Sequence, residues 1–170
     1  SVLRSCSASA LLVTHDPHEA LAICDRVVVI RRGEIQQYST PLDMVANPSN
    51  NFVGQFVLQR NTLPIQYIDH SYFTSIGKLN LSIDQRISSD SVCMFDKYSV
   101  ILDPDANGLC TVLAREYRIN SYVYKVILGD NKLSVEMNLQ TKLSIGDKCN
   151  VKSILGKEYL ILPEQIKSNF

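Results

Sequence analysis

The stretch "ALLVTHDPHEALAICDRVVVI" (Ala10–Ile30) orders an apolar run, a helix start and a second apolar run. The first run, Ala10–Thr14, predicts a strand buried on both faces. Asp16 is placed to cap a helix, Pro17 suits its first position and Glu19 its third. The run after the helix predicts a second buried strand. Strand, helix and strand at this spacing indicate a parallel α/β sheet.

The residues after this unit predict a return of the chain and a further helix. Arg32-Gly33 is typical of a turn, and Glu34–Tyr38 then reads as an edge strand. Thr40-Pro41 predicts the start of a short helix that ends near Asn47-Pro48. On the first helix, the 3.6-residue period places three residues on one side: Ala20, Leu21 and Cys24.

From Pro64 onward the sequence predicts almost only β-structure. Short segments with partial alternation are separated by turn signals at Asn107-Gly108, Gly129–Asn131 and Ile145–Asp147. Of these turns, Gly129–Asn131 is the clearest hairpin. Many short strands with regular turns indicate a small barrel or sandwich. We therefore divide the chain into an N-terminal domain of residues 1–52 and a linker with a β-rich domain of residues 53–170.

Composition narrows the function classes. The chain has 170 residues, a formal net charge of zero and a pI near 6.8, which argues against a nucleic-acid-binding protein. No apolar run approaches the length of a membrane span, and the N-terminus lacks the pattern of a secretion signal. The five cysteines are far apart and odd in number. We expect reduced thiols packed as small hydrophobic residues, and no metal site.

His15 is the residue that most suggests chemistry. Ligands of open α/β sheets bind beyond the carboxyl ends of the strands, and His15 follows the first predicted strand. An imidazole there can donate a hydrogen bond to a γ-phosphate and help to hold an attacking water. Taken alone, a His-Asp dipeptide is a weak signal, and the alternative is a surface histidine without chemistry. We expect His18 and His70 to face solvent.

The surroundings of His15 carry a specific resemblance. Residues Leu11–Val57 resemble the last segment of the nucleotide-binding domain of ABC transporter ATPases, whose switch histidine falls on His15. The matching motifs are Thr14-His15-Asp16, Glu19-Ala20, Asp25-Arg26, Val27–Ile30, Gly33-Glu34-Ile35 and Ser39-Thr40-Pro41. By this resemblance, His15 is a catalytic and ATP-binding residue that contacts the γ-phosphate when two such domains close on each other.

Other motifs of that family are absent from the chain. It has no G-x-x-x-x-G-K-[ST] loop, no Leu-Ser-Gly-Gly-Gln signature and no apolar run ending in Asp-Glu. The family places all three before the switch histidine. The resemblance therefore implies the C-terminal piece of a longer ATPase. ATP and Mg²⁺ would be cofactors of the intact protein, and we expect the fragment to have neither cofactor nor ATPase activity.

The β half is similar to the regulatory domain of ABC importer ATPases, an OB-like (TOBE-type) barrel. The linker "FVGQFVLQRNTLPI" (Phe52–Ile65) resembles the entry to that domain, especially in the ferric-iron group. The resemblance thus implies an importer that transports ferric iron. One departure is Phe95-Asp96-Lys97, where relatives carry Arg-Pro-Glu or Arg-Pro-Asp.

The resemblance also implies partners and a location. The intact subunit would form a homodimer on the cytoplasmic, inner face of the plasma membrane, docked onto permease subunits and served by an extracytoplasmic solute-binding protein. A non-enzymatic regulatory module that binds a small anion, a metal or a partner protein is the alternative. Three tyrosines could stack on bases or sugars, although we favour a core role for them: Tyr117, Tyr122 and Tyr124.

The first fifty residues raise a stability problem. Strands buried on both faces expose apolar surface and unpaired backbone groups when their neighbours are missing. At about 25 cal/mol per Å², several such residues left in water cost several kcal/mol. We therefore expect residues 1–50 to pair with a second copy, to dock onto the β half or to be partly disordered.

Overall fold

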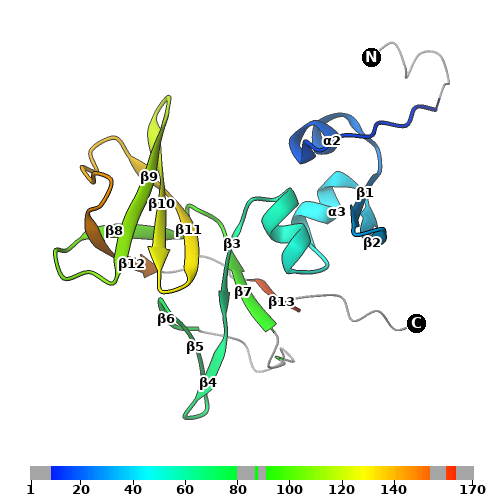
Figure 1. The fold of residues 1–170 in the computed structure, drawn as a ribbon. Helices are drawn as coiled ribbons and strands as arrows, with labels where there is room; N and C mark the ends of the chain where they lie inside the picture. The colour runs from blue at the N-terminus through cyan, green and yellow to red at the C-terminus, as the bar shows by residue number, and fades with distance from the viewer. Residues whose placement is uncertain (1–8, 80–86, 88–90, 154–159, 164–170) are drawn as a thin grey trace.

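The computed structural model describes residues 9–79, 87, 91–153 and 160–163. This part of the chain is mostly β-sheet with few helices. Figure 1 shows a lobe of short helices and one hairpin near the N-terminus, a curved sheet at the opposite end, and two smaller sheets between and below them. The β-rich character predicted for the second half is confirmed.

The N-terminal lobe has the helices that the sequence predicts. Its elements are α2 (Pro17–Ile23), β1 (Val27–Arg31), β2 (Glu34–Ser39), α3 (Pro41–Ala46) and the π-helical turn η1 (Val53–Val57). The Asp16 carboxylate caps α2, and the Thr40 hydroxyl caps α3 by accepting from the Asp43 N–H. The turn at Arg32 and Gly33 is confirmed, since both residues have positive φ, at 53° and 82°.

The prediction of a parallel sheet is wrong. Residues 10–14 form no strand, and Leu11 and Val13 are 91% and 87% exposed. Within the described residues, β1 pairs only with β2, and the pair is antiparallel. A strand needs a partner at each edge and cover on both faces to be buried, and Ala10–Thr14 has neither here. The strand β1 accordingly alternates between buried and exposed residues, as in a hairpin with one covered face.

The lobe has a small core of its own. It consists of Val27, Val29, Met44, Val53 and Val57. The predicted inner side of α2 is confirmed, because Ala20, Leu21 and Cys24 pack against this core. The helix that follows the candidate histidine is thereby held on the lobe by apolar contacts.

The β half is built around one five-stranded sheet in the order β11-β10-β9-β12-β8. Its strands are β8 (Val100–Pro104), β9 (Cys110–Arg118), β10 (Ser121–Leu128), β11 (Asn131–Asn138) and β12 (Lys148–Ser153). The outer strands β11 and β8 approach each other, since the Leu102 N–H lies 3.4 Å from the Met137 sulfur. The sheet is therefore curved so that its two edge strands come close to each other. The predicted hairpin at Gly129 is confirmed between β10 and β11.

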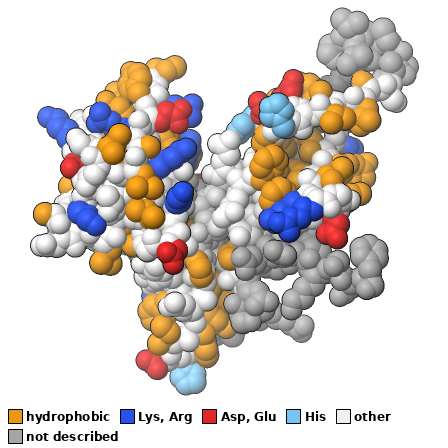
Figure 2. Space-filling model, viewed as in Figure 1, with side chains coloured by type: hydrophobic (Ala, Val, Ile, Leu, Met, Phe, Trp, Pro, Cys, Tyr) orange, Lys and Arg blue, Asp and Glu red, His pale blue; other side chains and the backbone are white. Residues whose placement is uncertain are grey.

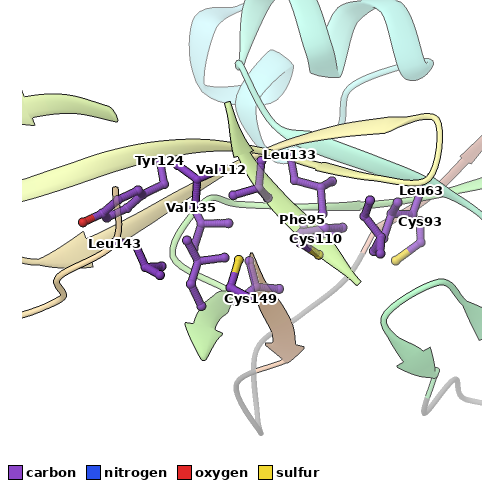
Figure 3. Close-up of a cluster of buried hydrophobic side chains, with 14 of the residues drawn as sticks. Leu63, Cys93, Phe95, Cys110, Val112, Tyr124, Leu133, Val135, Leu143 and Cys149 are labelled. Atoms are coloured by element: carbon purple, nitrogen blue, oxygen red, sulfur yellow. The ribbon is translucent and has the colours of Figure 1, made fainter. Parts of the chain in front are cut away.

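Two three-stranded sheets complete the β half. They comprise β3 (Asn61–Pro64), β7 (Ser91–Phe95) and β13 (Leu160–Pro163), and β4 (Gln66–Ile68), β5 (Ser71–Thr74) and β6 (Gly77–Lys78). Every residue of β7, the central strand of the first of these sheets, is buried. Figure 3 shows side chains from β3 and β7 meeting those of the curved sheet in one core, which includes Leu63, Phe95, Val112, Leu133 and Val135.

The lobe touches the β half through its helical end. A Cβ atom added to Gly54 in η1 would overlap the Met94 side chain on β7, so this side chain packs directly against the backbone of η1. The Arg60 N–H donates to the Gly54 carbonyl at 3.1 Å, which ties the linker back onto η1. These contacts involve Gly54 and Arg60, outside the residues 1–50 for which we expect docking or pairing with a second copy, so both expectations stay predictions.

Candidate functional site

His15 lies one residue before the cap of α2, in a backbone fixed on both sides. The Asp16 N–H donates to Thr14 Oγ1 at 3.0 Å. Asp16 Oδ1 in turn accepts from the His18 N–H at 2.9 Å and from the Glu19 N–H at 3.4 Å. The cap role predicted for Asp16 is thus confirmed. These bonds and the packing of α2 fix the point from which the imidazole of His15 projects.

The imidazole itself is free to take a ligand. His15 is exposed, and no hydrogen-bond or ion-pair partner for its ring lies within the described residues. A neutral imidazole offers one N–H donor and one acceptor nitrogen, and a protonated one offers two donors. The Asp16 carboxylate is occupied by the cap, so it is poorly placed to act as a base. The His15 imidazole can therefore donate one hydrogen bond to a ligand oxygen.

The other two histidines are exposed, as predicted. His18 lies in the first turn of α2, and His70 lies in the turn between β4 and β5. His70 Nδ1 is 3.4 Å from the Tyr67 hydroxyl. Figure 2 shows histidine side chains on the surface of the N-terminal lobe and at the far end of the β half. The structure does not bring His70 to the site near α2.

The segment Phe95-Asp96-Lys97 forms two ion pairs that sequence reasoning missed. Asp96 Oδ1 accepts from Arg60 Nε at 2.9 Å. Lys97 Nζ lies 2.9 Å from Glu136 Oε2. The turn after β7 is thereby tied to the linker on one side and to β11 on the other. Arg60 and Asp96 are 36 positions apart, so no local spacing in the sequence could have signalled the pair.

The ion pair at Glu136 alters the titration of both partners. Burial alone would raise the pKa of Glu136, but hydrogen bonds from Lys97 and Ser121 outweigh it and hold this pKa below its ordinary value of 4.5. The hydrogen bond to Glu136 raises the pKa of Lys97 above its ordinary value of 10.5. The charged forms of both side chains therefore stabilise the fold.

The three tyrosines on β9 and β10 divide into a buried and an exposed group. Tyr124 is fully buried, and its hydroxyl donates to the Thr141 carbonyl at 2.9 Å, which confirms the core role for this residue. Tyr117 is 64% exposed. Tyr122 lies between them: the centroid of its ring is 5.7 Å from that of Tyr117 and 6.0 Å from that of Tyr124. The Arg115 guanidinium lies 4.7 Å from the Tyr122 ring and covers one of its faces.

The cysteines behave as small hydrophobic residues. Cys93, Cys110 and Cys149 are buried in the core, Cys24 is half-buried, and all four are free thiols. Cys6 lies outside the described residues. Burial raises the pKa of Cys93 to about 12 and that of Cys149 to about 11. In the part of the chain that the structure describes, no three His, Cys, Asp or Glu side chains are grouped so as to hold a metal ion.

Comparison with known proteins identifies the relatives of this chain. It is 34% identical over 110 residues to the Fe(3+) ions import ATP-binding protein FbpC of Streptomyces coelicolor, covering 65% of this chain and 32% of that protein. It is 24% identical over 149 residues to the sulfate/thiosulfate import ATP-binding protein CysA of Bradyrhizobium diazoefficiens, covering 86% and 43% respectively. The chain is related to the ATP-binding subunits of ABC importers.

A third relative has a higher sequence identity to this chain, over a shorter segment. The sulfate/thiosulfate import ATP-binding protein CysA 2 of Chromobacterium violaceum is 43% identical over 63 residues, covering 37% of this chain and 17% of that protein. The chain thus spans less than half the length of each of these relatives. No protein-family model matches the chain. Among the described residues, no helix has the length and apolar character to cross a membrane.

Proposed function

We propose that this chain is the C-terminal portion of the ATP-binding subunit of an ABC importer, and that His15 contacts the γ-phosphate of ATP. The observation that carries the proposal is the Thr14-His15-Asp16 motif at a capped helix start, with an exposed imidazole that has no described partner. The relatives, which are named as import ATP-binding proteins, support the class of protein.

The residues at the start of α2 suit a single phosphate contact. His15 can donate a hydrogen bond to a phosphate oxygen, whereas Asp16 is committed to the helix cap. Bound ATP supplies the phosphoryl group that hydrolysis transfers to water. The chain contains no G-x-x-x-x-G-K-[ST] loop, so we assign the phosphate cradle, the magnesium ligands and the catalytic carboxylate to other parts of the subunit. On this assignment the chain alone does not hydrolyse ATP.

For the β half we propose an OB-like, TOBE-type regulatory and dimerisation domain. The five-stranded sheet whose outer strands approach each other supports this arrangement. The complete subunit would act as a homodimer on the cytoplasmic face of the membrane. Its partners would be permease subunits and, through them, an extracytoplasmic solute-binding protein.

Ferric iron is the solute that we propose. The ferric-iron relative matches 65% of this chain at 34% identity, whereas the sulfate relative that covers 86% of it is 24% identical. Of these two long matches, the ferric-iron relative has the higher identity, which favours iron, whereas the 43% match to a sulfate/thiosulfate relative spans 63 residues.

Solute uptake tests the proposal. The gene is deleted in its source organism and restored on a plasmid, and uptake of radiolabelled Fe(III) and sulfate is measured. We expect deletion to abolish iron uptake, restoration to recover it, and sulfate uptake to be unaffected. Loss of sulfate uptake with normal iron uptake would overturn the choice of iron. Normal uptake of both solutes would count against the choice of iron and sulfate alike.

A further inference from the structure

A pocket of about 350 Å³ lies where α3 and the linker meet the sheet β3–β7–β13. Figure 1 shows the helical segment beside this sheet. Two charged residues, Arg60 and Asp96, line the pocket. The rest of its lining is apolar and comes from both sides of the junction: Leu42, Val45, Ala46, Met94, Phe95 and Leu160. The pocket is therefore a mainly apolar space with one ion pair in its wall.

The cation of this ion pair has unused hydrogen-bonding capacity. The Arg60 side chain is 16% exposed, whereas Asp96 is 53% exposed. A guanidinium group has five N–H donors, and the Arg60 side chain uses its Nε–H on Asp96. Within the described residues, its two Nη groups have no partner. Because Arg60 is partly buried and its partner Asp96 is half exposed, a second anion inside the pocket would add a charge-assisted hydrogen bond to this cation.

We propose that this pocket binds a small amphipathic carboxylate, with the carboxylate on the Nη groups of Arg60 and the aliphatic chain against α3 and β7. The planar guanidinium fork matches a carboxylate in a two-point contact. The apolar walls suit an alkyl chain and give nothing to a hydrated inorganic anion. The volume is near the lower end of the range for ligand pockets, about 300 to 1,000 Å³, which limits the ligand to a small molecule.

Binding would join two parts of the fold. Leu42 on α3 is 81% exposed and Val45 is 41% exposed, although both line the pocket. A ligand chain laid between these residues and Met94 on β7 would cover them and hold the lobe against the β half. The carboxylate is thus an effector that stiffens the junction. This inference is independent of the proposed transport function, because it uses only the geometry of the pocket.

Calorimetric titration of the chain with octanoate tests the inference, with n-octanol and sulfate as matched probes. We expect saturable binding of one octanoate per chain, at least about tenfold weaker binding of the alcohol, and no binding of sulfate. Equal binding of octanoate and n-octanol would overturn the proposal, since the carboxylate would then contribute nothing. Sulfate binding as tight as that of octanoate would overturn it too, because the apolar walls would then have no role.

Substitutions locate the ligand. Arg60→Met should weaken octanoate binding by about tenfold or more, while Arg118→Met, which alters an exposed ion pair, should leave it unchanged. Asp96→Asn removes the competing carboxylate and should tighten binding. Should Arg60→Met fail to fold, Leu42→Ser at an exposed wall position should still weaken binding. Unchanged affinity in both Asp96→Asn and Leu42→Ser would place the ligand elsewhere and overturn the proposal.

Discussion

Asn61 and Ser134 exchange two hydrogen bonds, although 73 positions separate them in the chain. Asn61 Nδ2 donates to the Ser134 carbonyl, and the Ser134 N–H donates to Asn61 Oδ1, both at 2.7 Å. Asn61 begins β3 and is 5% exposed, whereas Ser134 lies in β11. The Asn61 side-chain amide thus pairs with the backbone of β11 as a neighbouring strand would, and it joins the sheet β3–β7–β13 to the curved sheet.

Replacement of this amide should destabilise the fold. In Asn61→Ala, the backbone N–H and carbonyl of Ser134 lose their partners, and each unsatisfied buried group costs about 1–3 kcal/mol. We expect a loss of about 2–4 kcal/mol in the free energy of unfolding, measured by urea denaturation. Asn107→Ala, at an exposed turn, is the control and should change it by less than about 0.5 kcal/mol. Equal stability of the two variants would show that the Asn61 contact contributes nothing.

The Lys97–Glu136 pair predicts a dependence of stability on pH. The folded-state pKa of Glu136 is lowered, so its contribution is complete above the ordinary value of 4.5 and is lost as the pH falls through the folded-state value. The urea midpoint of the chain should therefore fall on acidification below about pH 4.5, and Glu136→Gln should flatten this part of the curve. Glu116→Gln, at the exposed pair with Arg118, should leave the acid-side slope as it is. An unchanged slope in Glu136→Gln would refute the assignment.

Buried thiols predict a pattern of chemical labelling. The thiolate is the reactive form of cysteine, and burial raises the pKa of Cys93 to about 12 and that of Cys149 to about 11. In the folded chain near neutral pH, iodoacetamide should label Cys24 about a hundredfold faster than these two residues. In urea, all three should react at similar rates. Mass spectrometry of the digested protein gives each rate, and rapid labelling of folded Cys93 would contradict its burial.

The raised pKa values of Cys93 and Cys149 also predict a loss of stability at alkaline pH. A buried neutral thiol stabilises the fold fully below its ordinary pKa of 9.0 and ceases to do so as the pH rises through about 11 to 12. The urea midpoint should fall over this range, and Cys93→Ala should reduce the fall. A fall of the same size in Cys93→Ala would assign the alkaline transition to other groups.

Local signals in the sequence predict the local structure of this protein well. Asp16 and Thr40 cap the helices that their positions indicate, and the Gly129 turn forms the expected hairpin. These features depend on neighbouring residues, whose hydrogen bonds are set by short spacing. The strand predicted at Ala10–Thr14 failed because an apolar run becomes a strand only where other strands pair with it.

In the candidate site, too, local features could be predicted from the sequence and long-range contacts could not. The position of His15 at a helix start follows from the adjacent Asp16 and Pro17. The pairs Arg60–Asp96 and Asn61–Ser134 could not be predicted, because the topology of the β half brings together residues that are distant in the chain. Long-range contacts of this kind leave no periodic trace in a single sequence.

The most direct test of the central claim is ATP hydrolysis by the complete subunit with His15 replaced by alanine. His18→Ala is the matched control, because His18 is also an exposed histidine near the start of α2. If His15 contacts the γ-phosphate, His15→Ala should lower turnover by about a hundredfold or more, and His18→Ala should retain it. Undiminished hydrolysis in His15→Ala would contradict the role assigned to this residue.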